Sequence, residues 1–206
     1  MIAVIDYGSG NLKSVELALR YLGADFKITS ESRAVALSEK VIFPGVGEAE
    51  HAMGALRATR LDEALYDFVA SGRALLGICL GCQIVASHTE ENDTNLLGLL
   101  PWKVRRFPAL SGLKVPQIGW NTVTHDGSLL FEGVPQESSF YFVHSYYLPL
   151  CLADGAKSPW VAGRSEYGIP FAAVIHRKNI WATQFHPEKS GPRGLQVLRN
   201  FVERID

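Results

Sequence analysis

Two of the three cysteines, Cys79 and Cys82, lie in the stretch "LLGICLGCQ" with a C-x-x-C spacing. This spacing is compatible with a redox pair, with half of a zinc site, or with one nucleophile beside an incidental neighbour. A structural zinc site needs four ligands, and the sequence contains no second C-x-x-C or C-x-x-H pair. We therefore expect no metal and no cofactor, which leaves a nucleophile, a redox pair or two buried thiols.

Glycines stand two residues before and two residues after the first cysteine, in the order G-I-C-L-G from Gly77 to Gly81. This is the G-x-nucleophile-x-G pattern of a strand-to-helix elbow, in which small residues let the chain turn sharply. The pattern favours Cys79 as a nucleophile, with Cys82 packed in the core one helical turn later. A redox pair stays the alternative, because a helix N-terminus favours the thiolate that such a pair also needs.

A nucleophilic cysteine needs a base, and the base needs a group that orients it. Among the six histidines, only His186 shares one side of an extended segment with a carboxylate, that of Glu188 in "FHPE". Pro187 between them restricts the backbone on both sides. We expect Glu188 to accept from one ring nitrogen of His186, while the other nitrogen takes the thiol proton. A surface pair at a strand end is the alternative, and His144 is expected to be structural.

Acyl transfer through a thioester also needs hydrogen-bond donors for the developing oxyanion. The backbone N–H of Leu80, at the start of the helix after Cys79, is one expected donor. The second is expected from the turn "PGVG", Pro44 to Gly47, because glycines allow close approach of the backbone. An ordinary connection between a strand and a helix would have the same composition.

The first hundred residues alternate strand-like and helix-like segments. A strand in "IAVIDYG" precedes a helix in "LKSVELALRYLG", with Asn11 as its N-cap and Gly23 at its end. Strands are also expected in "FKIT", "VIF" and "ALLGIC", and helices from about Glu48 to Gly72, with a break near Arg60, and in "LGCQIVASHT". Repeated strand–helix units predict a mostly parallel sheet with ligands at the carboxyl ends of its strands.

After about Leu96 the chain is richer in strands. The runs "KVRRF", "TVTHD", "SSFYFVHSYYL", "FAAVIH" and "IWATQFH" are separated by Gly, Pro, Asn and Asp, and a last helix is expected in "GLQVLRNFVERI". We find no repeat or linker. The sequence predicts one α/β domain over residues 1–206, flavodoxin-like, with a mostly parallel central sheet, helices on both faces and additional antiparallel strands in the second half.

Composition excludes several classes of function. With 20 basic and 21 acidic residues the net charge is -1, which gives no electrostatic reason to expect nucleic acid or an anionic membrane as a partner. No charge-free apolar run reaches the roughly 18 residues of a membrane span, and the first residues lack the basic start of a signal peptide. An odd number of cysteines predicts reduced thiols in the cytoplasm.

These pieces together resemble the class I glutamine amidotransferases, which have a Cys-His-Glu triad on this fold. The elbow G-I-C-L-G-x-Q and the distal F-H-P-E match that family, and "DYGSGNLKS", "PGVGEAEHAM", "VPQIGWN", "YFVHSYY" and "QFHPEKSG" resemble its imidazole glycerol phosphate synthase glutaminases. The resemblance covers nearly the whole chain. It implies hydrolysis of L-glutamine and delivery of ammonia to a (β/α)8 cyclase subunit, in a heterodimer of histidine biosynthesis.

The resemblance also implies a role for individual residues. Cys79 would be the nucleophile, His186 the proton shuttle and Glu188 its orienter. The backbone amides of Val46 and Leu80 would form the oxyanion hole. The expected substrate contacts are Gly47, Gln83, Glu91, Ser145 and Tyr146, and the expected residues of the partner interface are Asn121, Tyr141 and Lys189.

Two positions depart from the family pattern. Cys82 stands where methionine is usual, a loss of volume behind the nucleophile worth about 1 kcal/mol. Gln117 stands where histidine is expected, and we expect it to alter partner contacts near Trp120 and Asn121. Three other functions compete with an amidotransferase: a stand-alone cysteine hydrolase, a redox protein, and a scaffold that has lost catalysis.

Overall fold

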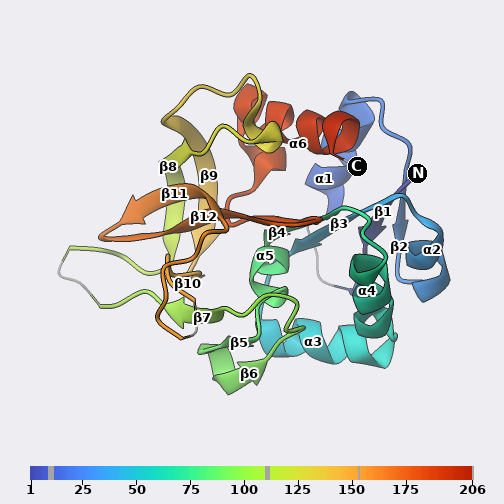
Figure 1. Cartoon of the computed structure of the whole chain (residues 1–206), viewed down its shortest axis with the longest axis horizontal. Coiled ribbons are helices and arrows are strands. Elements are labelled where there is room, and N and C mark those ends of the chain that lie inside the picture. Colours follow the sequence, from blue (N-terminus) through green and yellow to red (C-terminus); the bar gives the residue numbers. More distant parts are fainter. Residues whose placement is uncertain (9–11, 110–111, 153, 206) are drawn as a thin grey trace.

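The structure is a computed structural model that describes residues 1–8, 12–109, 112–152 and 154–205. A nine-stranded sheet in the order β2-β1-β3-β4-β13-β12-β11-β8-β9 crosses the molecule between two layers of helices (Figure 1). Its parallel half consists of β2 (Phe26–Thr29), β1 (Ile2–Ile5), β3 (Lys40–Gly45), β4 (Leu75–Cys79) and β13 (Ile180–Thr183). The side chains of β1, β4 and β13 are buried throughout, as expected for parallel strands covered on both faces.

The other half of the sheet is antiparallel and comes from the second half of the chain. It consists of β12 (Ile169–Arg177), β11 (Val161–Tyr167), β8 (Gln117–His125) and β9 (Ser138–His144). A small second sheet joins β10 (Tyr146–Tyr147), β7 (Lys103–Arg106), β5 (His88–Thr89) and β6 (Thr94–Asn95). It lies beside the end of β9, because β10 follows β9 after a single residue.

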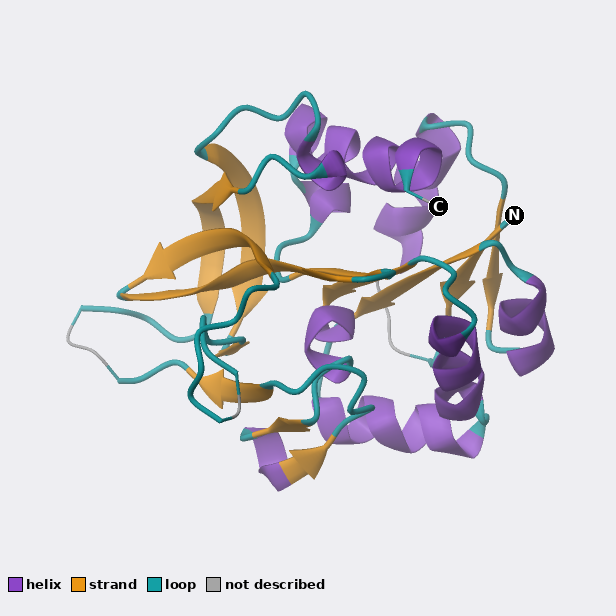
Figure 2. Cartoon of the chain, in the orientation of Figure 1, coloured by secondary structure: helices purple, strands orange, loops and turns teal. Residues whose placement is uncertain are grey.

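Helices cover both faces of the large sheet (Figure 2). On one face lie α1 (Leu12–Tyr21) and α6 (Gly191–Arg204), and on the other α3 (Ala49–Ala58), α4 (Leu61–Ala70) and α5 (Leu80–Ile84), with α2 (Ser32–Leu37) packed on α4. Short 3-10 helices are η1 (Glu91–Asp93), η2 (Leu129–Phe131) and η3 (Pro187–Lys189). Each face has its own apolar core, so the central parallel strands of the sheet are buried on both sides.

The predicted α/β class, with helices on both faces and antiparallel additions from the second half, is confirmed, although the sheet as a whole is mixed. The predicted helix in "LGCQIVASHT" is too long, since α5 ends at Ile84 and β5 begins at His88. Its last carbonyls are taken by a returning loop: the N–H groups of Leu97 and Leu100 donate to Ile84 and Val85. This tertiary pairing competes with continuation of the helix.

Helix α2 and strand β11 are among the elements that were not predicted. Helix α2 has only six residues, and β11 contains Gly163, Arg164 and Glu166, so neither has a clear apolar period. The proposed N-cap Asn11 lies outside the described residues.

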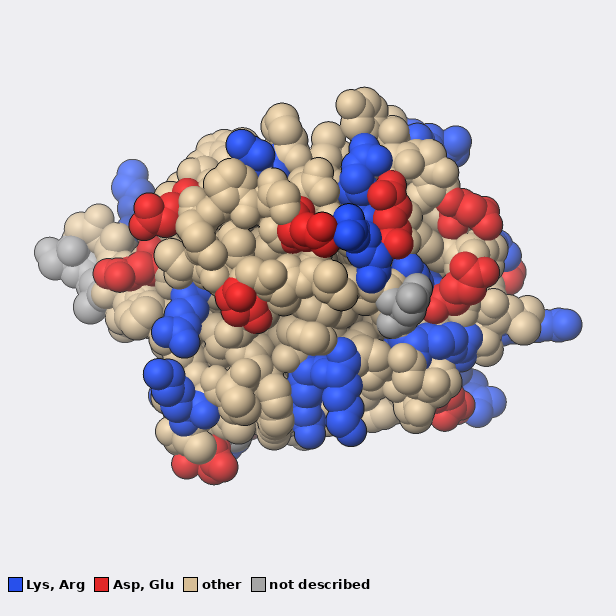
Figure 3. All heavy atoms as spheres, turned by 45° about the horizontal axis from the view of Figure 1, so that its top comes forward, with Lys and Arg blue, Asp and Glu red and all other residues tan. Residues whose placement is uncertain are grey.

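Charges of both signs are interspersed over the face shown in Figure 3. Within the described ranges, no helix is long and apolar enough to cross a membrane. No group of His, Cys, Asp and Glu side chains in that part of the chain is arranged to hold a metal ion.

Candidate active site

Cys79 sits at a sharp elbow, as the last residue of β4 and the N-cap of α5. Its φ of 55° and ψ of -105° lie in a region that L-residues rarely adopt. A Cβ on Gly77 would lie 2.6 Å from the backbone oxygen of Gly81, and a Cβ on Gly81 would overlap the backbone oxygen of Phe43. The G-x-C-x-G spacing therefore has a steric cause: the start of α5 packs directly on β3 and β4.

The second half of the predicted triad is also in contact. Nδ1 of His186 lies 2.7 Å from Oε1 of Glu188, and both side chains are 2% exposed. The expected extended segment is wrong, however, because Pro187 to Lys189 form the 3-10 turn η3, which brings the carboxylate back toward the ring. The hydroxyl of Ser190 accepts from the backbone N–H of Tyr141 at 2.9 Å and donates to the backbone oxygen of His186. This bridge ties the turn to β9.

The surroundings of His186 favour its protonated form. Burial alone lowers the pKa of this imidazole, but the neighbouring Cys79 and then Glu188 more than offset burial and raise the pKa to about 10. Nε2 of His186 is buried and has no hydrogen-bond partner among the described residues. Because Nδ1 is occupied by the carboxylate, Nε2 is the atom that can exchange a proton with the thiol or with a leaving group.

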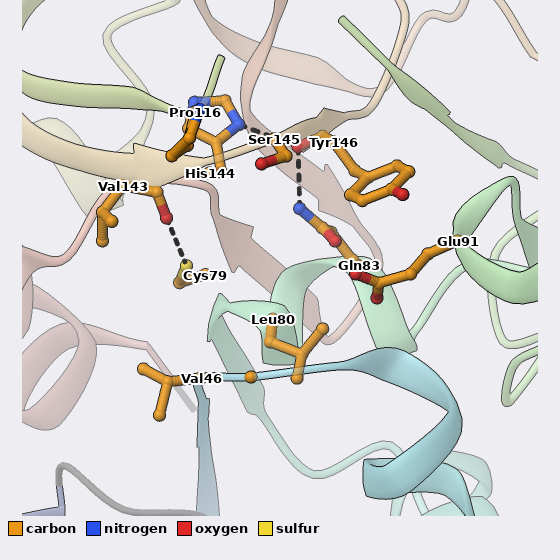
Figure 4. Close-up of a pocket in the computed structure, with 11 residues that line it drawn as sticks. Val46, Cys79, Leu80, Gln83, Glu91, Pro116, Val143, His144, Ser145 and Tyr146 are labelled. Atoms are coloured by element: carbon orange, nitrogen blue, oxygen red, sulfur yellow. Dashed lines mark hydrogen bonds between the residues drawn. The ribbon is translucent and has the colours of Figure 1, made fainter.

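A cavity of about 270 Å³ opens over the elbow (Figure 4). Every residue expected to contact the substrate or its oxyanion lines it, whereas His186 and Glu188 do not belong to its wall. The lining residues are Val46, Gly47, Cys79, Leu80, Gln83, Glu91, Pro116, Val143, His144, Ser145 and Tyr146. The wall thus combines the turn after β3, the elbow, the start of η1 and the β9–β10 connection.

Gln83 and Glu91 give the cavity its polar groups. The side-chain amide of Gln83 donates to the backbone oxygen of Tyr146 at 2.9 Å and to Oε1 of Gln184 at 3.0 Å. Both N–H donors are therefore used, and its amide oxygen is the atom left to accept from a ligand. Glu91 accepts the backbone N–H of Ala49 at 2.7 Å, and partial burial raises the pKa of its carboxyl despite that bond. A carboxylate in this position would pair with a ligand's ammonium group.

The first residue of α5 contributes a backbone donor beside the nucleophile. Leu80 is the N-terminal residue of that helix, where N–H groups have no acceptor within the helix. Val46 lines the same cavity from the turn after β3, next to Gly47, whose φ is +93°. Both residues line the cavity together with Cys79 (Figure 4).

His144 is structural, as expected, but it also lines the cavity. Its Nδ1 donates to the backbone oxygen of Tyr146 at 2.8 Å, and its Nε2 lies 3.1 Å from the side-chain amide of Gln117. Burial lowers the pKa of His144 to about 4, so the ring is neutral and its Nε2 must accept. We infer that the Gln117 NH2 group faces this nitrogen.

The expected role of Gln117 in partner contacts is wrong. Gln117 is 3% exposed and turned inward to His144, while Trp120 of the same strand is 59% exposed. Alternate residues of a strand face opposite sides, but the sequence alone did not say which side Gln117 takes. Glutamine in place of the usual histidine at position 117 therefore changes a residue that supports His144 in the cavity wall.

The second cysteine of the C-x-x-C pair is poorly suited to redox chemistry. Cys82 is fully buried, and burial, followed by the charge of Cys79, raises the pKa of the Cys82 thiol well above its ordinary range. A resolving thiol needs an accessible thiolate. Cys79, Cys82 and Cys151 are all free thiols, and Cys82 packs within the core, as expected.

The residues expected at a partner interface lie on the antiparallel half of the sheet or beside it. Asn121, Tyr141 and Lys189 are each partly exposed. Trp120 and Tyr141 are paired across β8 and β9, and their rings meet edge to face at 6.2 Å. Ile118, two residues before Trp120 on β8, is 64% exposed.

Several contacts of the site were missed. Val143 accepts from the thiol of Cys79 at 3.7 Å, and Gln184 donates to the same sulfur at 3.9 Å. Gln184 stands two residues before His186, directly after β13, and this spacing was the available signal. Nothing in the sequence signals the backbone oxygen of Val143.

The comparisons with known proteins concern nearly the whole chain. The family model described as "Glutamine amidotransferase class-I" matches residues 3–205. The chain is 49% identical to the imidazole glycerol phosphate synthase subunit HisH of Herpetosiphon aurantiacus, over 98% of this chain and 94% of that protein. It is 43% identical to the subunit of the same name from Bacteroides thetaiotaomicron, over 98% of each. A crystal structure of a glutamine amidotransferase superposes with a TM-score of 0.73 at 21% identity, covering 98% of each chain.

Proposed function

Because the chain belongs to the class-I glutamine amidotransferase family, we propose that it is the glutaminase subunit of an imidazole glycerol phosphate synthase. It hydrolyses L-glutamine and supplies the ammonia to a cyclase subunit in histidine biosynthesis. The observation that carries the proposal is the elbow cysteine at the floor of a cavity, with a buried His186–Glu188 pair behind it. It forms one amidotransferase domain over residues 1–206, and its three free thiols suit the cytoplasm.

The reaction proceeds through a thioester on Cys79. The thiolate attacks the side-chain amide carbon of glutamine, and the oxyanion is stabilised by the backbone N–H groups of Val46 and Leu80. His186 protonates the leaving nitrogen, which departs as ammonia, and then takes a proton from the water that hydrolyses the thioester. Glu188 holds the imidazole through Nδ1 at 2.7 Å and needs to transfer no proton itself.

The cavity wall selects glutamine by its two ends. Glu91 pairs with the ammonium group, and the amide oxygen of Gln83 accepts from the substrate. Gly47, Ser145 and Tyr146 complete the wall, and the reaction needs no cofactor.

The ammonia is consumed by a cyclase subunit with a (β/α)8 barrel fold. This partner docks against Asn121, Tyr141 and Lys189, next to the exposed Trp120. The backbone of Tyr141 is bonded to His186 through its oxygen and to Ser190 through its N–H, so the interface strand also touches the turn of the triad.

Glutamate formation from L-glutamine tests the proposal, with the chain alone and with a cyclase subunit and its nucleotide ligand. We expect Cys79→Ala to lower the coupled activity by about a thousandfold or more, because no other group in the site can form the thioester. Cys82→Ser is the matched control, since it removes the neighbouring thiol and should keep most of the activity.

Two results would contradict the proposal. Retention of coupled activity in Cys79→Ala would remove the nucleophile from the mechanism. A loss in Cys82→Ser as large as that in Cys79→Ala, in a folded chain, would instead support redox chemistry by the cysteine pair.

A further inference from the structure

A continuous chain of buried hydrogen bonds links the cavity wall to the thiol of Cys79. Nε2 of Gln83 donates to the backbone oxygen of Tyr146 at 2.9 Å and to Oε1 of Gln184 at 3.0 Å. Nε2 of Gln184 then donates to Sγ of Cys79 at 3.9 Å. Gln184 is 0% exposed and Gln83 is 5% exposed, so water competes little for these donors.

The backbone oxygen of Tyr146 determines the direction of both amides. A carbonyl oxygen can only accept, so Gln83 must turn its NH2 group toward Tyr146, which also accepts from Nδ1 of His144. The second N–H of the same group points at Gln184, which must turn its oxygen to receive it. The NH2 end of Gln184 therefore faces the sulfur. Flipping either amide would set two donors or two acceptors against each other.

Strand pairing holds Gln184 in place beside the elbow. β13 runs parallel to β4, with Thr183 opposite Ile78, so the next residue of each strand, Gln184 and Cys79, meet at the carboxyl edge. The backbone N–H of Gln184 donates to the oxygen of Ala173 at 2.8 Å, which fixes the position on its other side. Gln184 is thus tied to the sheet directly after the end of β13.

The two contacts of the Cys79 sulfur act in opposite directions. The backbone oxygen of Val143 accepts from the thiol at 3.7 Å and so favours the protonated sulfur. An N–H donor from Gln184 favours the thiolate, because a hydrogen bond to a charged acceptor is stronger than one to a neutral acceptor. Removal of this donor would leave His186, whose pKa Cys79 raises, as the remaining neighbour that favours the thiolate, and Val143 as the contact that favours the thiol.

We propose that Gln184 is a further catalytic residue, whose side-chain N–H stabilises the Cys79 thiolate in an orientation set by the cavity wall through Gln83. The proposal rests on the proposed function, in which Cys79 is the nucleophile. Gln83 therefore has two roles: its amide oxygen accepts from the substrate, and its NH2 group orients Gln184, which donates to the sulfur of Cys79.

Alkylation of Cys79 by iodoacetamide, followed over pH, reports the thiolate without using glutamine. The Cys151→Ser background removes the exposed thiol, and peptide masses locate the product. We expect Gln184→Met to move the midpoint of the alkylation profile upward by about one pH unit, so that the rate below the midpoint falls about tenfold. The rate at high pH should stay the same, because the thiolate itself is unchanged.

Thr183→Val is the matched control. Thr183 is equally buried on the preceding position of β13 and loses a hydrogen bond to the backbone oxygen of Phe185, but it does not touch the sulfur. Its profile should keep the midpoint of the parent chain. An unchanged midpoint in folded Gln184→Met, or an equal shift in Thr183→Val, would overturn the proposal.

Gln83→Met tests the same orientation if Gln184→Met does not fold. Without the donor from Gln83, the amide of Gln184 is free to rotate, so a smaller shift in the same direction is expected. No shift in that variant would contradict the proposal. Failure of the proposed glutaminase function is a separate result. Full activity in Cys79→Ala would show that Cys79 is not the nucleophile, but it would not change the alkylation profiles of the chains that retain Cys79.

Discussion

The parallel and antiparallel halves of the large sheet contribute to the site in different ways. The parallel half places Cys79 through backbone crowding, in which Gly81 touches the backbone of Phe43 so closely that a Cβ has no room. The antiparallel half contributes a wall through hydrogen bonds and aromatic contacts, while its outer surface exposes Trp120. The difference teaches that the position of Cys79 is set by steric crowding, which tolerates little change, whereas the wall depends on a network of polar side chains.

The two halves of the sheet also differ in the electrostatic surroundings of their buried histidines. His186, after the parallel strand β13, faces Cys79 and Glu188, and its pKa is raised to about 10. His144, at the end of β9, faces a backbone oxygen and an amide, and burial lowers its pKa to about 4. Neighbours capable of negative charge make one ring an acid–base group, and neutral neighbours make the other a fixed bridge.

The largest expected effect is on the histidine of the parallel half. Glu188→Gln should lower glutaminase activity by about a hundred to ten thousand fold, because the imidazolium loses its charged acceptor. The exposed Glu203→Gln on α6 is the control and should change little. Steady-state rates with the cyclase subunit present measure both variants, and activity within a few fold of the parent in Glu188→Gln would argue against a triad.

The same variant has a signed pH dependence. A pKa raised from its ordinary 6.5 to about 10 means that protonated His186 stabilises the folded chain. This contribution is complete below about pH 6.5 and is lost as the pH rises through about 10. Glu188→Gln should shrink it, so urea unfolding at pH 7 and pH 10 should differ less in the variant than in the parent.

The next effect concerns the crowded elbow. Gly81→Ala should destabilise the chain by about 3 kcal/mol, because the new methyl group must displace the backbone of β3. Gly54→Ala on α3 is the opposite case, since a Cβ there meets nothing within 4 Å, and it should stabilise by about 0.5 to 1 kcal/mol. Chemical denaturation compares the two. Equal stabilities would mean that glycine is not required for the close approach at the elbow.

The outer face of the antiparallel half should affect assembly and not stability. Trp120→Ala is expected to weaken binding of the cyclase subunit by about 2 kcal/mol, a typical value for a central aromatic residue of an interface. Tyr21→Ala removes an aromatic residue that is 74% exposed on α1 and serves as the control. Titration calorimetry would place the interface elsewhere if the two variants bound equally well.

The smallest effect at neutral pH is expected for the histidine of the antiparallel half. Its lowered pKa means that neutral His144 stabilises the fold above about pH 6.5, and the contribution is lost as the pH falls through about 4. His144→Gln should therefore flatten the pH dependence of unfolding in this window, by up to about 1.4 kcal/mol per pH unit. Parallel curves for parent and variant would show that His144 does not titrate there.

Much of the site could be predicted because its signals are local. The glycines around Cys79, the spacing of His186 and Glu188, and the turn that contains Val46 each span a few residues of sequence. The boundary of α5 was wrong because a loop from Leu97 to Leu100 takes the carbonyls that a longer helix would use. The helix propensity of the residues around Ile84 does not reveal this competition, because the competing N–H groups come from a later segment of the chain.

The sequence by itself determined the class of fold and the family, and it predicted which cysteine is reactive and which histidine is its base. Only the tertiary structure decided that Gln117 faces inward to His144 and that Gln184 donates to the Cys79 sulfur. Gln83 and Gln184 are 101 positions apart, and their hydrogen bond exists only because β4 and β13 lie side by side. Turns and caps are encoded by neighbours in sequence, whereas the direction of a buried amide follows from whichever acceptor the folded sheet brings against it.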